Sequence, residues 1–123
     1  MNWSKDFYMQ ANKTPSEQDI YRFLGLCMKA GKLVSGEDQV IDAVRKGSTA
    51  LVIVALDASE NSKKRYADKC TFYKIQTVVF GSCDNLGKCT GKKKRAALAV
   101  MDQGFAKALN EKLLQYHQVY SEN

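Results

Sequence analysis

The sequence lacks the features of a secreted, membrane-bound or metal-binding protein. No apolar run approaches the roughly 18 residues of a membrane-spanning helix, and residues 1–16 carry no signal-peptide pattern. The four cysteines form no C-x-x-C pair and only one histidine is present, so the ligand spacing of a structural zinc site is absent. We therefore expect reduced thiols, no metal, no cofactor and a cytoplasmic location. The cysteines are Cys27, Cys70, Cys83 and Cys89.

Signals for catalysis are also weak. Residues 81–88 (GSCDNLGK) superficially resemble a phosphate-binding loop, but five residues instead of four precede the Gly-Lys pair, and Cys89 replaces the Ser or Thr that should follow. His117 is the one histidine that can activate a cysteine, and no carboxylate is placed to orient it. We expect a protein that binds a partner and is not an enzyme.

Negative charge is scarce relative to positive charge. The 123 residues include 19 Lys and Arg against 13 Asp and Glu, a formal net charge of +6. An excess of this size favours a polyanionic partner such as nucleic acid, although a merely soluble basic surface has the same composition. The position of the charges in the chain has to separate these alternatives.

Helical and strand-like patterns alternate along the chain. Thr14 is placed as an N-cap with Pro15 at the first helical position, and Asp102 is placed as the cap of the last helix. The alternation predicts an α/β fold: a small mixed or parallel sheet with helices on both faces. We expect one domain at 14–120 after a tail at 1–13. The expected helices cover residues 15–30, 36–46, 59–73, 84–89 and 102–120, and the expected strands cover 33–35, 51–56, 77–80 and 96–101, with 51–56, 77–80 and 96–101 as buried strands.

Two segments have the composition of a binding site. Residues 29–42 (KAGKLVSGEDQVID) contain a helix end, Lys32, a small-residue turn and the start of a second helix, whose backbone N–H groups attract phosphate or base acceptors. Residues 87–95 (GKCTGKKKR) form a glycine-punctuated loop with four consecutive cations directly before a buried strand. A second basic run at 63–65 is expected on an outward helix face.

These segments lie within a longer resemblance. The stretches AGKLVSGEDQVIDAVRKG, LVIVALDASENSKK, LGKCTG and AALAVMDQGFAKAL resemble the bacterial YlxQ-type branch of the ribosomal-protein L7Ae/L30e superfamily over residues 17–114. The best-known members of this superfamily bind kink-turn RNA. The resemblance implies a three-layer α/β/α sandwich around a mixed four-stranded sheet. It also implies a structured RNA partner, with the ribosome as one source, held by the second helix's N-terminus and the loop before the last strand.

The match is incomplete at the residues that read RNA in kink-turn binders. Gly36 matches the family's glycine and Glu37 its spacer, whereas Asp38 stands at an asparagine position and Gln39 at a glutamate position. Asp42 stands where the family has a phosphate-pairing lysine. Acidic residues at 37 and 38 are also explained by favourable charge at a helix start.

The basic loop departs from the family as well. Apolar residues that pack against an extruded base are usual there, and here all four positions are basic, which favours phosphate attraction over shape recognition. The alternative is a protein-interaction module that uses the acidic face at 37–42 and an aromatic tail with Trp3, Phe7 and Tyr8. The candidate RNA-binding residues are Lys32, Gly36, Glu37, Asp38, Gln39, Lys92, Lys93, Lys94 and Arg95.

Overall fold

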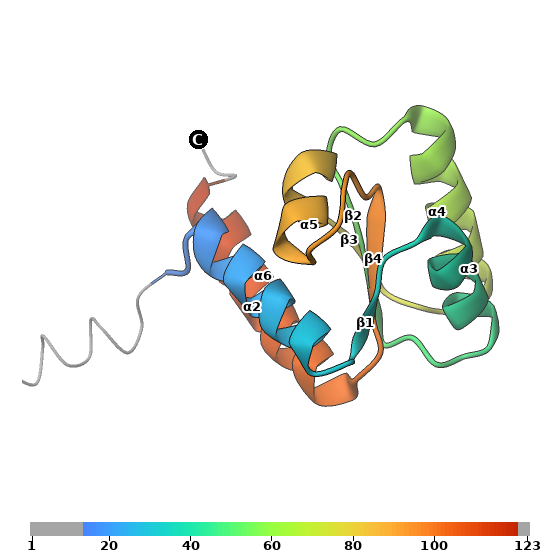
Figure 1. Ribbon diagram of the computed structural model, residues 1–123, viewed down its shortest axis with the longest axis horizontal. Helices are drawn as coiled ribbons and strands as arrows, with labels where there is room; N and C mark the ends of the chain where they lie inside the picture. Colours follow the sequence, from blue (N-terminus) through green and yellow to red (C-terminus); the bar gives the residue numbers. More distant parts are fainter. Residues whose placement is uncertain (1–13, 121–123) are drawn as a thin grey trace, which may run out of the picture.

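A mixed four-stranded sheet forms the centre of the molecule in the computed structural model, which describes residues 14–120 (Figure 1). The strands are β1 (Leu33–Val34), β2 (Leu51–Val54), β3 (Thr77–Val79) and β4 (Ala97–Val100), in the spatial order β1-β4-β2-β3. Strand β4 runs antiparallel to both of its neighbours, and β2 pairs with β3 in parallel. The predicted mixed sheet is therefore confirmed.

Helices cover both faces of this sheet. Helices α3 and α4 pack side by side on one face, and α2, α5 and α6 form the layer on the other (Figure 1). This arrangement is the three-layer α/β/α sandwich that the resemblance implied. The helices are α2 (Glu17–Lys29), α3 (Glu37–Arg45), α4 (Glu60–Phe72), α5 (Cys83–Cys89) and α6 (Gln103–Tyr120).

The sheet topology gathers four chain segments where the strands end, and we call this end of the sheet the sheet edge. Because β1, β2 and β3 point the same way and β4 points the opposite way, the carboxyl ends of the first three meet the amino end of the fourth. The residues at this edge are Ser35 and Gly36 after β1, Leu56 and Asp57 after β2, Gly81 and Ser82 after β3, and Arg95 before β4. Loops at such an edge are where α/β folds bind ligands.

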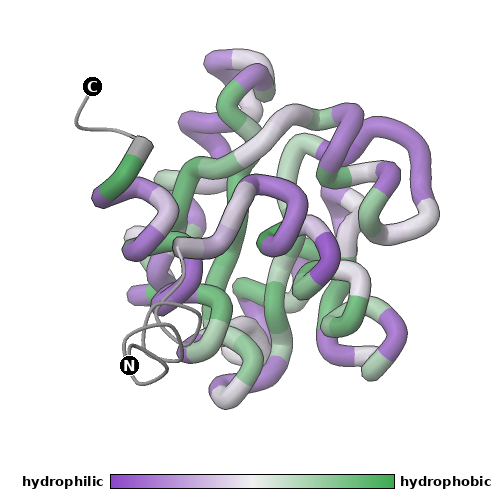
Figure 2. Tube along the Cα trace, turned by 90° about the vertical axis from the view of Figure 1, so that its left-hand side faces the viewer, coloured by the Kyte–Doolittle hydropathy of each residue, from purple (hydrophilic) through white to green (hydrophobic). Residues whose placement is uncertain are grey.

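The core lies on the two central strands. All four residues of β2 and of β4 are buried, and Figure 2 shows hydrophobic segments concentrated along the strands. The prediction of a buried third strand was wrong, because β3 is an edge strand with Val79 43% exposed. Among residues 14–120, no helix combines the length and apolar character needed to cross a membrane.

The first helix begins later than predicted. Its N-cap is Ser16, whose hydroxyl accepts from the Asp19 backbone N–H while the Asp19 carboxylate accepts from the Ser16 N–H, so Thr14 is not the cap and Pro15 is not helical. The reciprocal pair satisfies two N–H groups, which makes Ser16 the stronger cap. The predicted cap of α6 is confirmed, since Asp102 accepts from the Phe105 N–H at 2.9 Å.

Candidate functional site

The two segments singled out in the sequence meet in space. Arg95 Nε donates to Ser35 Oγ at 3.2 Å, and Arg95 Nη1 donates to the Lys94 carbonyl at 3.0 Å. The Arg95 backbone N–H donates to the Cys83 carbonyl at 3.0 Å, which ties the loop to α5. Arg95 thus joins the loop before β4 to the turn that opens α3.

The start of α3 is open. Gly36 is its N-cap and provides no side-chain hydrogen bond, so the first N–H groups of the helix are not capped by a side chain. The exposed Gln39 carboxamide lies directly over Gly36, where a Cβ would collide with it. Glu37 and Asp38 are exposed in the first turn. The helix therefore offers backbone donors, a neutral amide and two carboxylates at the sheet edge.

Arg65 of α4 also reaches this site, a contact that was not expected of the basic run at 63–65, although Lys64 and Arg65 are exposed as predicted for an outward helix face. Arg65 Nη1 donates to Glu37 Oε1 at 2.6 Å, and both side chains are about half exposed. The contact arises because α4 packs beside α3, and no local pattern reveals a contact across 28 residues. Burial, with Glu37 nearby, raises the pKa of Tyr66 to about 12, so this ring stays neutral beneath the pair.

The remaining carboxylates on α3 differ in their surroundings. Asp42 Oδ2 accepts from Lys46 Nζ at 3.0 Å, an ion pair one turn along the helix. Asp38 forms no ion pair with any residue between 14 and 120. Glu37 and Asp42 are thus each neutralised by a neighbouring cation, and Asp38 is the carboxylate left to oppose an anionic ligand.

The basic loop has a rigid base. The Lys92 N–H donates to the Gly87 carbonyl at 2.8 Å, and the buried Thr90 hydroxyl donates to the carbonyls of Leu86 and Gly87 at 3.0 Å. Gly87 is required here, because a Cβ at this position would overlap the backbone carbonyl of Lys93. The backbone of the loop therefore packs against α5.

The loop's lysines point to solvent from this base. Lys92, Lys93 and Lys94 are exposed, and Lys94 Nζ lies 3.9 Å from Asp84 Oδ1. Lys92 and Lys93 form no ion pair within the described part of the chain. Lys32 is set apart from them: its carbonyl accepts from the Met101 N–H, which places it at the opposite end of β1 and β4. The structure thus groups eight of the nine candidates and separates the ninth.

The turn after β2 completes the edge and was not anticipated from the sequence. Asp57 Oδ1 accepts from the Cys83 N–H at 2.8 Å, and this bond lowers the pKa of the Asp57 carboxyl. Burial and the facing Asp57 raise the pKa of the Cys83 thiol. Leu56, next to Asp57, is 62% exposed. The bond from α5 to Asp57 fixes this turn beside the basic loop.

No catalytic arrangement occurs among residues 14–120. No group of His, Cys, Asp and Glu there is placed to hold a metal ion. Burial raises the pKa of the Cys27 and Cys89 thiols to about 11, so neither is an activated nucleophile. His117 stacks edge-on against Tyr116 at a centroid distance of 5.5 Å.

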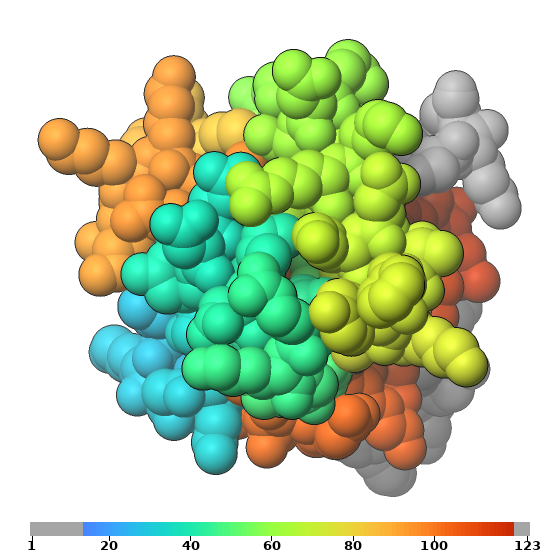
Figure 3. All heavy atoms as spheres, turned by 90° about the vertical axis from the view of Figure 1, so that its right-hand side faces the viewer, coloured from blue at the N-terminus to red at the C-terminus, as the bar shows by residue number. Residues whose placement is uncertain are grey.

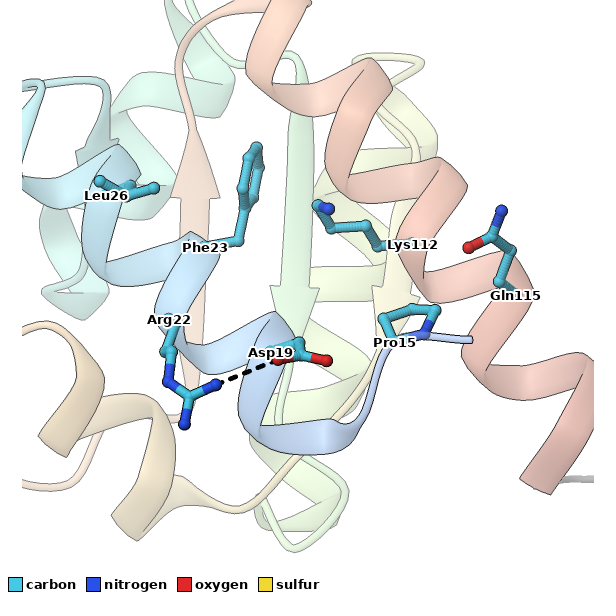
Figure 4. Close-up of a pocket in the computed structure, with 7 residues that line it drawn as sticks. All are labelled: Pro15, Asp19, Arg22, Phe23, Leu26, Lys112 and Gln115. Atoms are coloured by element: carbon cyan, nitrogen blue, oxygen red, sulfur yellow. Dashed lines mark hydrogen bonds and ion pairs between the residues drawn. The ribbon is translucent and has the colours of Figure 1, made fainter. Parts of the chain in front are cut away.

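A hollow between α2 and α6 is lined by charged side chains that are paired or packed against a ring (Figure 4). Its Arg22 is paired with Asp19 at 3.1 Å, and its Lys112 Nζ lies 5.2 Å from the Phe23 ring centroid. The contact of Lys112 with Phe23 joins α6 to α2, whereas the pair of Arg22 with Asp19 lies within α2. The hollow lies in the helix layer opposite α3.

The fold and the site together define a small α/β/α domain with a candidate binding edge built from a basic loop and a helix N-terminus. Residues 18–110 match the Ribosomal protein L7Ae/L30e/S12e/Gadd45 family, and the chain belongs to that family. It is 43% identical over 94 residues to the RNA-binding protein YlxQ of Bacillus subtilis, covering 76% of this chain and 94% of that protein. It is 35% identical over 96 residues to the RNA-binding protein YlxQ of Enterococcus faecium, covering 78% and 92%.

Solved structures support the same assignment. A Bacillus halodurans protein superposes with a TM-score of 0.73 at 38% identity, covering 76% of this chain and 95% of that one. The Giardia lamblia 15.5kD RNA binding protein superposes with a TM-score of 0.66 at 16% identity, covering 88% and 95%. The second likeness shows a shared fold.

Proposed function

We propose that this chain is a non-enzymatic RNA-binding protein that recognises structured RNA. The observation that carries the proposal is the bond between Arg95 and Ser35, which joins a loop of four cations to an open helix N-terminus. Relatives named as RNA-binding proteins at 43% and 35% identity support it, as does the net charge of +6. Phosphate contacts dominate the affinity of such surfaces and base contacts give specificity.

Each part of the edge has a role in this proposal. The cations at 92–95 hold phosphates, with Arg95 fixed and the three lysines adjustable. The exposed carboxamide of Gln39 accepts hydrogen bonds from a base edge, and the first N–H groups of α3 bind a phosphate or a base acceptor. Lys32, at the other end of the sheet, contributes only long-range attraction.

The finer proposal is a kinked RNA element, with the ribosome as its source. Gly36 and the uncapped start of α3 support it, because the family resemblance implies a glycine and a helix N-terminus at this position of the RNA site. Gln39 and Asp42 weaken it, since a neutral amide accepts hydrogen bonds less strongly than a carboxylate and Asp42 carries the wrong charge. The pairing of Asp42 with Lys46 reduces the second objection.

The alternative of a protein-interaction module loses support from the ion pairs. Its acidic face depends on Glu37, Asp38 and Asp42, and two of these three are paired with Arg65 and Lys46. The aromatic tail that it also uses lies outside the described residues. We therefore keep RNA as the partner.

The test compares two triple variants in titrations of a folded RNA hairpin. Lys92, Lys94 and Arg95 are changed to Ala in one, and the exposed cations Arg22, Lys29 and Lys107 of the α2 and α6 layer are changed to Ala in the other. Both lose one Arg and two Lys, so the net charge falls equally. We expect at least a tenfold loss for the first and less than a threefold loss for the second. Equal losses would mean diffuse attraction without a site.

A further inference from the structure

Two hollows that share Arg65 lie along the outer face of α3 and α4, and we call them together the furrow. One hollow is lined by Asp38, Gln39, Ile41, Asp42, Arg45 and Arg65, and the next by Arg65, Asp68, Lys69, Phe72 and Tyr73. Arg65 lines both hollows, and its bond to Glu37 joins them to the start of α3. Figure 3 shows the basic loop in orange, α3 in teal and α4 in yellow-green on one face.

The far end of this furrow carries an exposed aromatic ring. Phe72, at the end of α4, is 76% exposed, a larger fraction than for any other large hydrophobic residue in the described part of the chain. Tyr73 contacts it edge-on at a centroid distance of 4.9 Å and an interplanar angle of 70°. This contact supports the Phe72 ring on one side and leaves its exposed surface open for a planar partner.

The charge around the ring is positive after ion pairs are counted. On α3 and α4, Lys46, Lys63, Lys64 and Arg65 are each within 4.0 Å of a carboxylate. Arg45, Lys69 and Lys74 form no ion pair with residues 14–120. Among the carboxylates of this face within the same residues, only Asp38 forms no ion pair. Two of the three unpaired cations, Lys69 and Lys74, are within three residues of Phe72 in sequence. An exposed ring among cations suits a nucleobase and its phosphates better than an apolar protein surface.

We propose that this furrow binds a single-stranded extension of the RNA, with an unpaired base stacked on Phe72. The inference rests on the proposed RNA-binding function and adds to it the class of RNA: a folded element with an unpaired flank. From Arg65 to Phe72 is seven residues of helix, roughly 10 Å. That length corresponds to about three nucleotides at a stacked rise of 3.4 Å. Arg45 and Lys69, the two unpaired cations that line the hollows, contact the phosphates between the folded element and the stacked base.

The test uses two RNAs and four proteins. The RNAs are one hairpin with blunt ends and the same hairpin with a four-nucleotide single-stranded extension. The proteins are the wild type, Phe72→Ala, Phe72→Trp and the control Leu114→Ala, which removes a 59% exposed side chain from α6 in the opposite layer. Circular dichroism melting confirms that every variant is folded.

We expect the wild type to bind the extended hairpin at least about fivefold more tightly than the blunt one, as one stacked base allows. Phe72→Ala should lose this advantage and keep its affinity for the blunt hairpin. Phe72→Trp should retain the advantage, as should the Leu114 variant. A fluorescent adenine analogue in the extension should be quenched by the wild type and by the Trp variant.

Three results overturn the inference. One is an equal affinity of the wild type for both RNAs, and another is an unchanged advantage in Phe72→Ala. The third is an equal loss on both RNAs in Phe72→Ala. Any of these would assign the ring to a protein contact or to packing. Failure of the wild type to bind either RNA is a separate result, which would contradict the proposed function itself.

Discussion

Arg95 and Ser35 are 60 residues apart in the sequence, and a 3.2 Å hydrogen bond from Nε to Oγ joins their side chains. This bond holds the only arginine of the basic loop against the turn that opens α3. A ligand that reaches the loop therefore also reaches the first turn of the helix. RNA binding at this site requires that junction.

Salt should weaken RNA binding strongly. The loop places four cations, at 92–95, at the site, and each neutralised phosphate releases about 0.7–0.9 counterions. We therefore expect a slope of roughly −3 to −4 when the logarithm of the association constant is plotted against that of salt concentration. Fluorescence anisotropy between low and moderate salt measures this slope. A flat response would remove the electrostatic basis of the proposal.

Changing Gly87 to Ala should destabilise the fold and disturb the basic loop. The added Cβ would overlap the Lys93 carbonyl, so the loop or α5 has to move. We expect a loss of about 1–3 kcal/mol in the free energy of unfolding, measured in urea. Gly25→Ala is the control, because its Cβ would lie 3.2 Å from the Cys89 carbonyl and a small shift relieves it. A Gly87 variant as stable as the wild type would contradict the packing of this loop on α5.

Removing the charge of Glu37 should strengthen RNA binding. In Glu37→Gln, Arg65 loses its charged partner and keeps at most a weaker neutral acceptor, so it becomes available to phosphate, while one negative charge disappears from the site. We expect an affinity gain of about two- to fivefold at low salt. Stability should change by less than about 1 kcal/mol, because the pair is exposed.

The control for Glu37→Gln is Glu60→Gln, which removes another exposed carboxylate that pairs with a lysine of α4, at 3.7 Å. It should leave affinity within about twofold of the wild type. Weaker binding by Glu37→Gln would mean that Glu37 itself contacts the RNA as a hydrogen-bond acceptor.

Replacing Asp42 with Lys should favour kinked RNA. Because Lys46 already neutralises part of the carboxylate's charge, we expect a gain of roughly three- to tenfold. Adding Gln39→Glu should raise selectivity for kinked RNA over a plain duplex, since a charged acceptor binds guanine donors more strongly. The measurement compares the wild type, Asp42→Lys and the double variant on both RNAs. If no variant prefers kinked RNA, the RNA bound here is of another shape.

Local signals in the sequence located most helices and strands, but they did not show which elements lie next to one another in the fold. Asp102 and the glycine stops after α2 and α3 mark helix ends by short-range hydrogen bonding, so they were predictable. The cap predicted at Thr14 was wrong by two residues, because the reciprocal bonds with Asp19 make Ser16 the cap. The exposure of β3 follows from strand order, which no pattern within residues 77–80 encodes.

The parts of the site that consist of consecutive residues were predictable, and the contacts between distant residues were not. The loop at 92–95 and the turn at Gly36 stand out by composition, and the resemblance implied that they meet. The contact of Arg65 with Glu37 was missed because it depends on the packing of α4 beside α3. Lys32 was grouped with the site because of its nearness in sequence to Gly36, but β1 carries the chain across the sheet between them.

The most direct test maps the bound RNA on the protein. Two-dimensional NMR spectra of the isotope-labelled chain, recorded during titration with a structured RNA hairpin, report each backbone amide separately. The account predicts that the largest shifts fall on residues 35–39 and 91–95, with smaller shifts around Arg65. Shifts confined to α2 and α6, or none at all at low salt, would contradict it.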